Sequence, residues 1–322
     1  MTMQAAFHFP SLVWDWPIAI YLFLLGISAG ATTLSVLLRR KGAGSESGII
    51  KATAILAPAS VILGLLILIF HLARPWTFWK LMFHYQFDSV MSMGVMLFQL
   101  YMAVLFAWLA VVFRAEIETL RGRLLQEKFA FVDGLIGWLA RIERLLAPLL
   151  LLLAVLLGAY TGFLLSALKT YPLLNNPVLP VLFLVSGISS GIASTILLAV
   201  TLFKENHHSQ GVSFVHRFER PVLAVEVLLL VCFFTGLYFG GGQKEVAMWA
   251  AIGSGFWAQV FWLGVVGIGM LLPQLLPQLL ALLTPAPLRE RNGHLVLVCS
   301  LTLVGILLLR YFVLYAGQMT VV

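Results

Sequence analysis

The feature that most constrains this chain is a succession of eight apolar runs, each long enough to cross a lipid bilayer. The runs cover about residues 16–38, 52–73, 89–113, 145–168, 178–203, 221–240, 248–272 and 294–316. A helix that crosses the hydrocarbon core needs about 20 predominantly apolar residues, and each run meets that requirement. We therefore predict an all-α integral membrane protein with eight transmembrane helices.

The composition supports this class and excludes several others. Of the 322 residues, 61% are apolar and 10% are charged, whereas soluble domains carry about 25% charged residues. A large soluble enzyme is excluded, and so is a nucleic-acid-binding protein, despite the net charge of +7. Cys232 and Cys299 both lie in apolar runs, and of seven histidines only His71 lies near a span at useful depth. We therefore expect no disulfide framework, metal or haem in this protein.

The distribution of basic residues predicts which way the helices run. Fifteen of the 20 Lys and Arg residues follow the first, third, fifth and seventh runs, and four lie in the even-numbered connections. Because Lys and Arg accumulate in cytoplasmic loops, both termini are predicted to be periplasmic, in a bacterial inner membrane. Residues 1–15 contain no Lys or Arg, and the first run is too long for a signal peptide, so we expect no cleaved leader.

Two segments depart from the regular succession of spans. Between the third and fourth runs, apolar residues recur at helical spacing within the charged stretch 114–144, which predicts a helix lying in the membrane interface. After the seventh run, Pro273 and Pro277 predict a break followed by a short surface segment.

An internal repeat divides the chain near its middle. GISAGATTLSVLL at 26–38 matches GISSGIASTILLA at 187–199, an offset of 161 residues. The matching segments are the first and fifth spans, which run in the same direction, so we predict two parallel four-helix bundles, 1–168 and 169–322. Close helix packing through small residues also explains Gly26, Gly30, Gly187 and Gly191 without any ligand.

Candidate functional residues collect at the predicted periplasmic ends of the first four spans. Asp15 precedes the first span, His71 and Arg74 end the second, Asp88 opens the third, and Tyr160 lies about eight residues before the end of the fourth. Ionisable groups at membrane depth are costly and usually face a cavity, a partner or a pathway. A base, an acid and a fixed cation near one face can bind a quinol headgroup and accept its protons at His71 or Asp88. The phenol of Tyr160 can hydrogen-bond a quinone carbonyl.

Each candidate also has a structural alternative. Arg74 could contact lipid headgroups, His71 and Asp88 could form a structural pair, and Tyr160 could be a packed tyrosine. The residues alone leave these alternatives open.

Two ionisable residues lie inside the spans of the second half. Glu226 is about 8 Å and Arg310 about 24 Å from the cytoplasmic side, so we expect no direct pair. Arg310 is expected to extend outward beside Tyr311 and Tyr315, and Glu226 to meet basic residues such as Arg217 or Arg220. Two isolated groups predict no proton relay and therefore electroneutral turnover.

Four segments resemble the NrfD family, the quinol-handling membrane subunits of periplasmic nitrite reductase and polysulfide reductase systems. They are WDWPIAIYLFLLGISAGATTL from Trp14, HLARPWTFWKLMFHYQFDSVMSMGVMLFQLYM from His71, LLGAYTGFLLSALKTYPLLNNPVLPVLFLVSGISSG from Leu156, and RYFVLYAGQ from Arg310. The resemblance is weakest at 114–144 and 204–247, and greatest to members that serve formate-dependent nitrite reduction.

This resemblance implies a quinone pocket in the first bundle near the periplasmic face. Tyr160 matches a fourth-span tyrosine that contacts the quinone headgroup in related subunits. Asp15 stands where relatives can carry Asn or His in the first span, which leaves the hydrogen-bonding pattern open.

The resemblance also implies a function and its partners. Menaquinol, or alternatively ubiquinol, would be oxidised near the outer face and release two protons to the periplasm. Its electrons would pass to a periplasmic ferredoxin-like iron–sulfur subunit and on to multihaem cytochromes c of a nitrite reductase system. A proton- or solute-conducting transporter subunit is the alternative, which predicts polar residues midway through several spans. A third interpretation is a passive membrane anchor for a periplasmic complex.

Overall fold

The computed structural model describes residues 6–72, 74–124, 131–205, 209–283 and 293–321. Within them, eight helices are long and apolar enough to cross a membrane, which confirms the predicted number. Seven are α2 (Trp16–Arg40), α3 (Gly48–His71), α5 (Val90–Val112), α8 (Glu143–Ser166), α9 (Leu179–Thr201), α10 (Gln210–Gly240) and α15 (Gly293–Gln318). The remaining span is built from α12 (Phe256–Gln259), a π-helix η2 (Val260–Leu271) and α13 (Leu272–Leu283).

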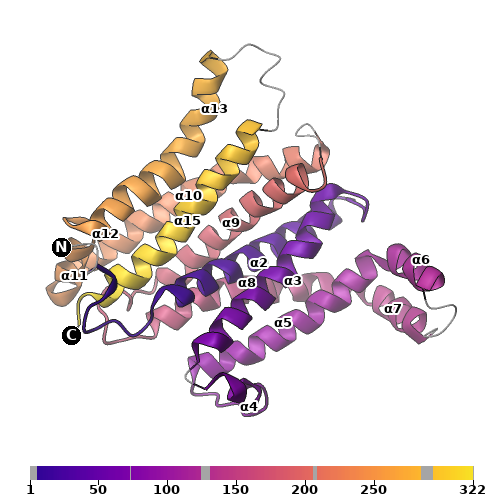
Figure 1. Ribbon diagram of the computed structural model, residues 1–322, viewed down its shortest axis with the longest axis horizontal. Helices are drawn as coiled ribbons and strands as arrows, with labels where there is room; N and C mark the ends of the chain where they lie inside the picture. The colour runs from indigo at the N-terminus through magenta and orange to yellow at the C-terminus, as the bar shows by residue number, and fades with distance from the viewer. Residues whose placement is uncertain (1–5, 73, 125–130, 206–208, 284–292, 322) are drawn as a thin grey trace.

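The centre of the molecule is the contact between α2 and α9, the two segments that match in sequence (Figure 1). A Cβ on Gly26 would lie 3.1 Å from the Cα of Gly187, and a Cβ on Gly30 or Gly191 would overlap backbone of the opposite helix. The two backbones therefore touch directly, as small residues at a membrane helix crossing allow. Around this pair, α3 packs mainly on α2, α8 packs on both α2 and α9, and α10 and α15 pack on α9. The division into bundles at residue 168 stays a prediction.

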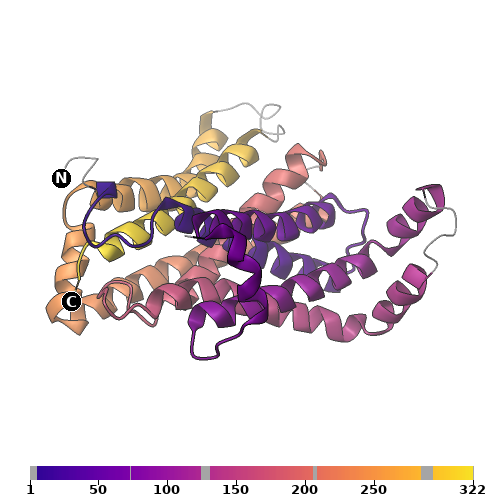
Figure 2. The same cartoon turned by 60° about the horizontal axis from the view of Figure 1, so that its bottom comes forward.

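Both termini lie at one end of the helices, and the charged connection lies at the other (Figures 1 and 2). Gln318 at the end of α15 hydrogen-bonds the backbone of Trp14, which places the two termini side by side. An even number of spans produces this arrangement. We call the end with the termini the outer face, and its periplasmic location stays a prediction from the basic residues.

The single interfacial helix predicted for 114–144 is wrong. The structure has two helices, α6 (Arg114–Leu124) and α7 (Phe131–Arg141), and residues 125–130 between them lie outside the described part. In α7, Ile136 is buried and Leu139 packs against the core. The apolar spacing is therefore confirmed as helical over Phe131–Arg141, while the position of this stretch in the membrane interface stays a prediction.

The predicted break at Pro273 and Pro277 is also wrong, because α13 continues directly from η2 through both prolines. Proline normally removes a bond to the preceding turn and clashes with it. The π-helix immediately before Pro273 changes that turn, since its hydrogen bonds span one residue more than those of an α-helix. The sixth span likewise begins at Gln210, eleven residues before the predicted start, and carries Pro221 inside it.

The remaining short helices lie at the outer face. They are η1 (Pro75–Thr77) and α4 (Phe78–Phe83) between α3 and α5, and α11 (Gly242–Ile252) between α10 and α12. The connection 72–89 carries large exposed apolar side chains, including Trp76 and Phe83.

Candidate functional site

Asp15 and His71 meet at the outer face, whereas the pair considered from the sequence was His71 with Asp88. Asp15 immediately precedes α2 and His71 is the last residue of α3. The Nε2 of His71 lies 3.2 Å from Oδ1 of Asp15, with the two side chains 33% and 41% exposed. That oxygen makes no aligned hydrogen bond with the described residues, so the carboxylate keeps the capacity to accept one. A base and an acid thus lie together, half open to the surroundings.

The position of Asp15 is fixed from the opposite half of the chain by Gln318. Its Oε1 accepts from the backbone N–H groups of Val13 and Trp14, at 2.9 and 3.0 Å. Its Nε2 donates to the carbonyls of Trp14 and Leu314, at 2.8 and 2.9 Å. Sequence reasoning missed Gln318, although a glutamine closing an apolar helix is a signal, because a buried amide needs partners.

Other contacts hold the N-terminal segment 6–14 on the outer ends of the second half. Tyr171 donates to the carbonyl of Ser11 at 2.8 Å, and the indole N–H of Trp257 donates to the carbonyl of Ala6 at 3.1 Å. The ring of Phe7 packs edge-on against Trp257 and Tyr315. The segment therefore lies across one half and delivers Asp15 to the other.

A layer of aromatic rings lies beneath the Asp15–His71 pair. Tyr160 is six residues before the end of α8, about 9 Å below that end. Its ring meets Phe98 of α5 edge-on at 5.5 Å, and Phe98 meets Tyr21 of α2 at 6.3 Å. A Cβ on Gly94 of α5 would overlap the phenol of Tyr160, so this glycine makes room for the hydroxyl. Tyr160 is 7% exposed, and within the described residues its hydroxyl forms no hydrogen bond.

The structure does not bring Arg74 and Asp88 into contact with this pair. Both are exposed in the connection between α3 and α5, and within the described residues neither forms an ion pair. Arg74 contributes its carbonyl, which accepts from the backbone and hydroxyl of Thr77 at the start of η1. Asp88 lies in the turn just before α5.

The expectation for Arg310 is wrong. Its guanidinium is fully buried, donates to the carbonyl of Phe183 at 3.0 Å and lies 3.8 Å from the centre of that ring. A Cβ on Gly26 would lie 3.4 Å from its Nη2, so the small residue at the α2–α9 contact gives the side chain room to turn inward. As expected, Arg310 forms no ion pair with Glu226 in the part of the chain that the structure describes.

The described residues contain no group of three or more His, Cys, Asp or Glu side chains that could hold a metal ion. That the protein holds neither metal nor haem stays a prediction.

Comparison with known proteins gives matches over the whole sequence. The family described as "Polysulphide reductase, NrfD" matches residues 4–322. The protein is 56% identical to Protein NrfD of Escherichia coli, covering all of both sequences. It is 52% identical to the Protein NrfD homolog of Haemophilus influenzae, covering 98% of this sequence and 97% of the relative. It is 40% identical to a polysulfide reductase subunit of Wolinella succinogenes, covering 97% and 96%.

Proposed function

Since this chain belongs to the polysulphide reductase NrfD family, we propose that it oxidises a quinol at the outer face and delivers the electrons to a partner subunit. The observation that carries the proposal is the Asp15–His71 pair, 41% and 33% exposed at the outer face, with the unpaired hydroxyl of Tyr160 about 9 Å below the outer end of α8. A quinol headgroup needs a hydrogen-bonding partner for its oxygen and a base for its protons, and these groups supply both.

The geometry of the pair favours His71 as the first proton acceptor. Its Nε2 faces the carboxylate of Asp15, so a proton on Nε2 leaves the Nδ1 lone pair free to accept one from the quinol. The imidazolium that forms is stabilised by the neighbouring carboxylate. Both side chains are at least one third exposed, so the proton can leave to the outer medium before the second transfer.

In the proposed reaction, the protons and the electrons of the quinol go to different acceptors. Quinol becomes quinone by losing two protons and two electrons. The protons leave through His71 and Asp15 to the outer side. The electrons pass to a periplasmic ferredoxin-like iron–sulfur subunit, and from there to multihaem cytochromes c of a nitrite reductase system. Menaquinol is the favoured quinol.

Arg74 and Asp88 are proposed to act at the rim of this site. They lie on the exposed connection next to His71 rather than in contact with it. We propose that Arg74 binds the headgroup as it enters and that Asp88 takes up a released proton. In this arrangement the site opens to the outer face of an inner membrane, with both termini periplasmic.

Reconstitution tests the proposed function. The purified protein, its iron–sulfur partner and lipid are mixed in vesicles, and menaquinol is added. The clusters of the partner should be reduced, as followed by their absorbance. If dithionite reduces the clusters but menaquinol does not, the proposal is wrong.

Gly94→Ala is expected to weaken quinone binding about fivefold, because the added methyl group would occupy the space of the Tyr160 phenol and displace its hydroxyl. Gly64→Ala is the matched control. A Cβ there would lie 3.5 Å from the ring of Tyr21, an ordinary contact, and binding should stay at the wild-type level. Fluorescence titration with a quinone analogue measures both variants. Equal affinities in the two variants would remove Tyr160 from the site.

A further inference from the structure

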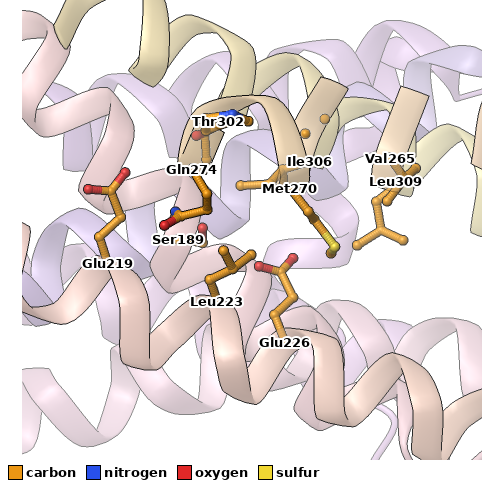
Figure 3. A pocket seen from close by; sticks show the side chains of 13 residues that line it. Ser189, Glu219, Leu223, Glu226, Val265, Met270, Gln274, Thr302, Ile306 and Leu309 are labelled. Carbon is orange, nitrogen blue, oxygen red and sulfur yellow. The ribbon is translucent and has the colours of Figure 1, made fainter. Parts of the chain in front are cut away.

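A buried carboxylate faces a cavity in the second half of the protein. Glu226 lies in the middle of α10, is 2% exposed, and forms neither a hydrogen bond nor an ion pair within the described residues. Its side chain lines a cavity of about 20 Å³ together with Ser189 of α9, Met270 of η2 and Thr302 of α15 (Figure 3). A cavity holds a water once it offers about 10–15 Å³. There is therefore room for one water beside Glu226.

A wider cavity adjoins this inner cavity on the side of the face opposite the termini. Glu219, Pro273 and Gln274 line both cavities, and the wider one, of about 380 Å³, is also lined by His216 and Arg217. Figure 3 shows Glu219, Leu223 and Glu226 along one helix, with Gln274 approaching from another. Their spacing of four and three residues places them on one face of α10. Water can therefore approach Glu226 along α10. The contact expected between Glu226 and Arg217 or Arg220 is wrong, because Glu226 faces the inner cavity instead.

The first half is filled at the matching position. Ser28, which matches Ser189 in the repeat, donates to the carbonyl of Ala57 at 2.6 Å and lies 2.8 Å from the hydroxyl of Tyr101. That hydroxyl also lies 2.6 Å from the hydroxyl of Thr32. Ser189 forms no hydrogen bond within the described residues and lines the cavity instead. At Ser28 the matching position is taken up by hydrogen bonds, so the cavity at Ser189 does not follow from the packing that the two repeats share.

The groups around the cavity suit a proton better than a metal ion. Glu219 on α10 and Arg310 on α15 are the charged residues that face or interact with Glu226, while α9, η2 and α13 present Ser189, Met270 and Gln274. Metal cations such as Ca²⁺ and Mg²⁺ need about six or more oxygen ligands, and one water with few side-chain oxygens falls short of that. Arg310 donates a hydrogen bond to the carbonyl of Phe183. It places a fixed positive charge between Glu226 and the outer face.

We propose that Glu226 is a proton-binding site that exchanges with the face opposite the termini, through Glu219 and a single bound water. The charge of Arg310 opposes passage of a proton farther toward the outer face. This site is separate from the proposed quinol site, so a negative result at one does not count against the other.

Dicyclohexylcarbodiimide tests the proposal on the full-length protein in vesicles, because this reagent couples to protonated carboxyl groups in apolar surroundings. Glu226 should be modified, as mapped by peptide mass spectrometry, and its rate should fall about tenfold per pH unit once the carboxyl is mostly ionised. The rate should follow the pH on the side of the α9–α10 connection. Ser189→Leu, which fills the cavity, should slow modification at least tenfold.

The partly exposed Glu245 in the same protein serves as the internal control and should stay unmodified. Absence of modification at Glu226, or a rate independent of pH, would overturn the proposal. Protection when sodium replaces choline at constant pH would also overturn it, because the site would then bind a metal cation. These results come from the wild-type protein and do not depend on the folding of a variant.

Discussion

Replacing His71 with alanine is expected to lower quinol-driven reduction of the iron–sulfur partner about 100-fold, since a positioned general base contributes about 10²–10⁴-fold. His71 is the nitrogen base of the pair with Asp15, and alanine removes it without filling the space. Asp15→Asn keeps the shape but removes the charge that stabilises the imidazolium, so we expect a loss of about tenfold. Initial rates in vesicles, normalised to the amount of protein, measure both variants.

His84 is the matched control for this prediction. It is exposed at the same outer face just after the end of α4, and its ring contacts the carbonyl of Lys80 within that helix. His84→Ala should therefore keep the wild-type rate. A wild-type rate in His71→Ala would show that the quinol loses its protons elsewhere.

Replacing Gln318 with alanine is expected to lower the same rate about 30-fold, although Gln318 does not touch the proposed site. The substitution leaves the N–H groups of Val13 and Trp14 and the carbonyl of Trp14 without their partner. Each unsatisfied buried group costs about 1–3 kcal/mol, so the segment leading to Asp15 should shift. A loss of about 2 kcal/mol in orientation corresponds to the expected rate change.

A double variant separates this positioning effect from general destabilisation. In an Asp15→Asn background, Gln318→Ala should cause only about a threefold further loss, down to the rate of Gln318→Ala alone, because both changes act through the same side chain. Asn176→Ala is the matched control, since it removes another buried amide, which bonds the carbonyl of Phe233 and the N–H of Val178. It should leave the rate near wild type. Fully additive losses for Asp15 and Gln318 would contradict a positioning role.

The spans could be predicted from the sequence because a bilayer imposes the same length and polarity on every one of them. Their ends were less predictable where a local signal competed with packing. Pro221 and Pro273 both indicate helix ends, yet both lie inside helices. The π-helix before Pro273 has no sequence signature of comparable strength, so continuity there could be seen only in the structure.

The candidate site likewise contains residues that could be predicted from the sequence and residues that could not. Asp15, His71 and Tyr160 could be selected by depth, because residues at the ends of neighbouring spans share a level. Gln318 could not, because its partners are more than 300 residues away in the sequence. Arg310 was misplaced for a related reason: its inward orientation depends on Gly26 of α2 and Phe183 of α9, which no reading of its own helix reveals.

Binding of a quinone analogue to the purified protein, without its iron–sulfur partner, tests the central claim most directly. Titration should show saturable binding to the wild-type protein and binding about tenfold weaker in Tyr160→Phe, because a hydrogen bond contributes about 0.5–1.5 kcal/mol. Tyr171→Phe, which removes a hydroxyl bonded to Ser11 in the second half, is the control and should bind nearly as wild type. Equal affinity in Tyr160→Phe and wild type, or no binding by either, would contradict a quinol site at this position.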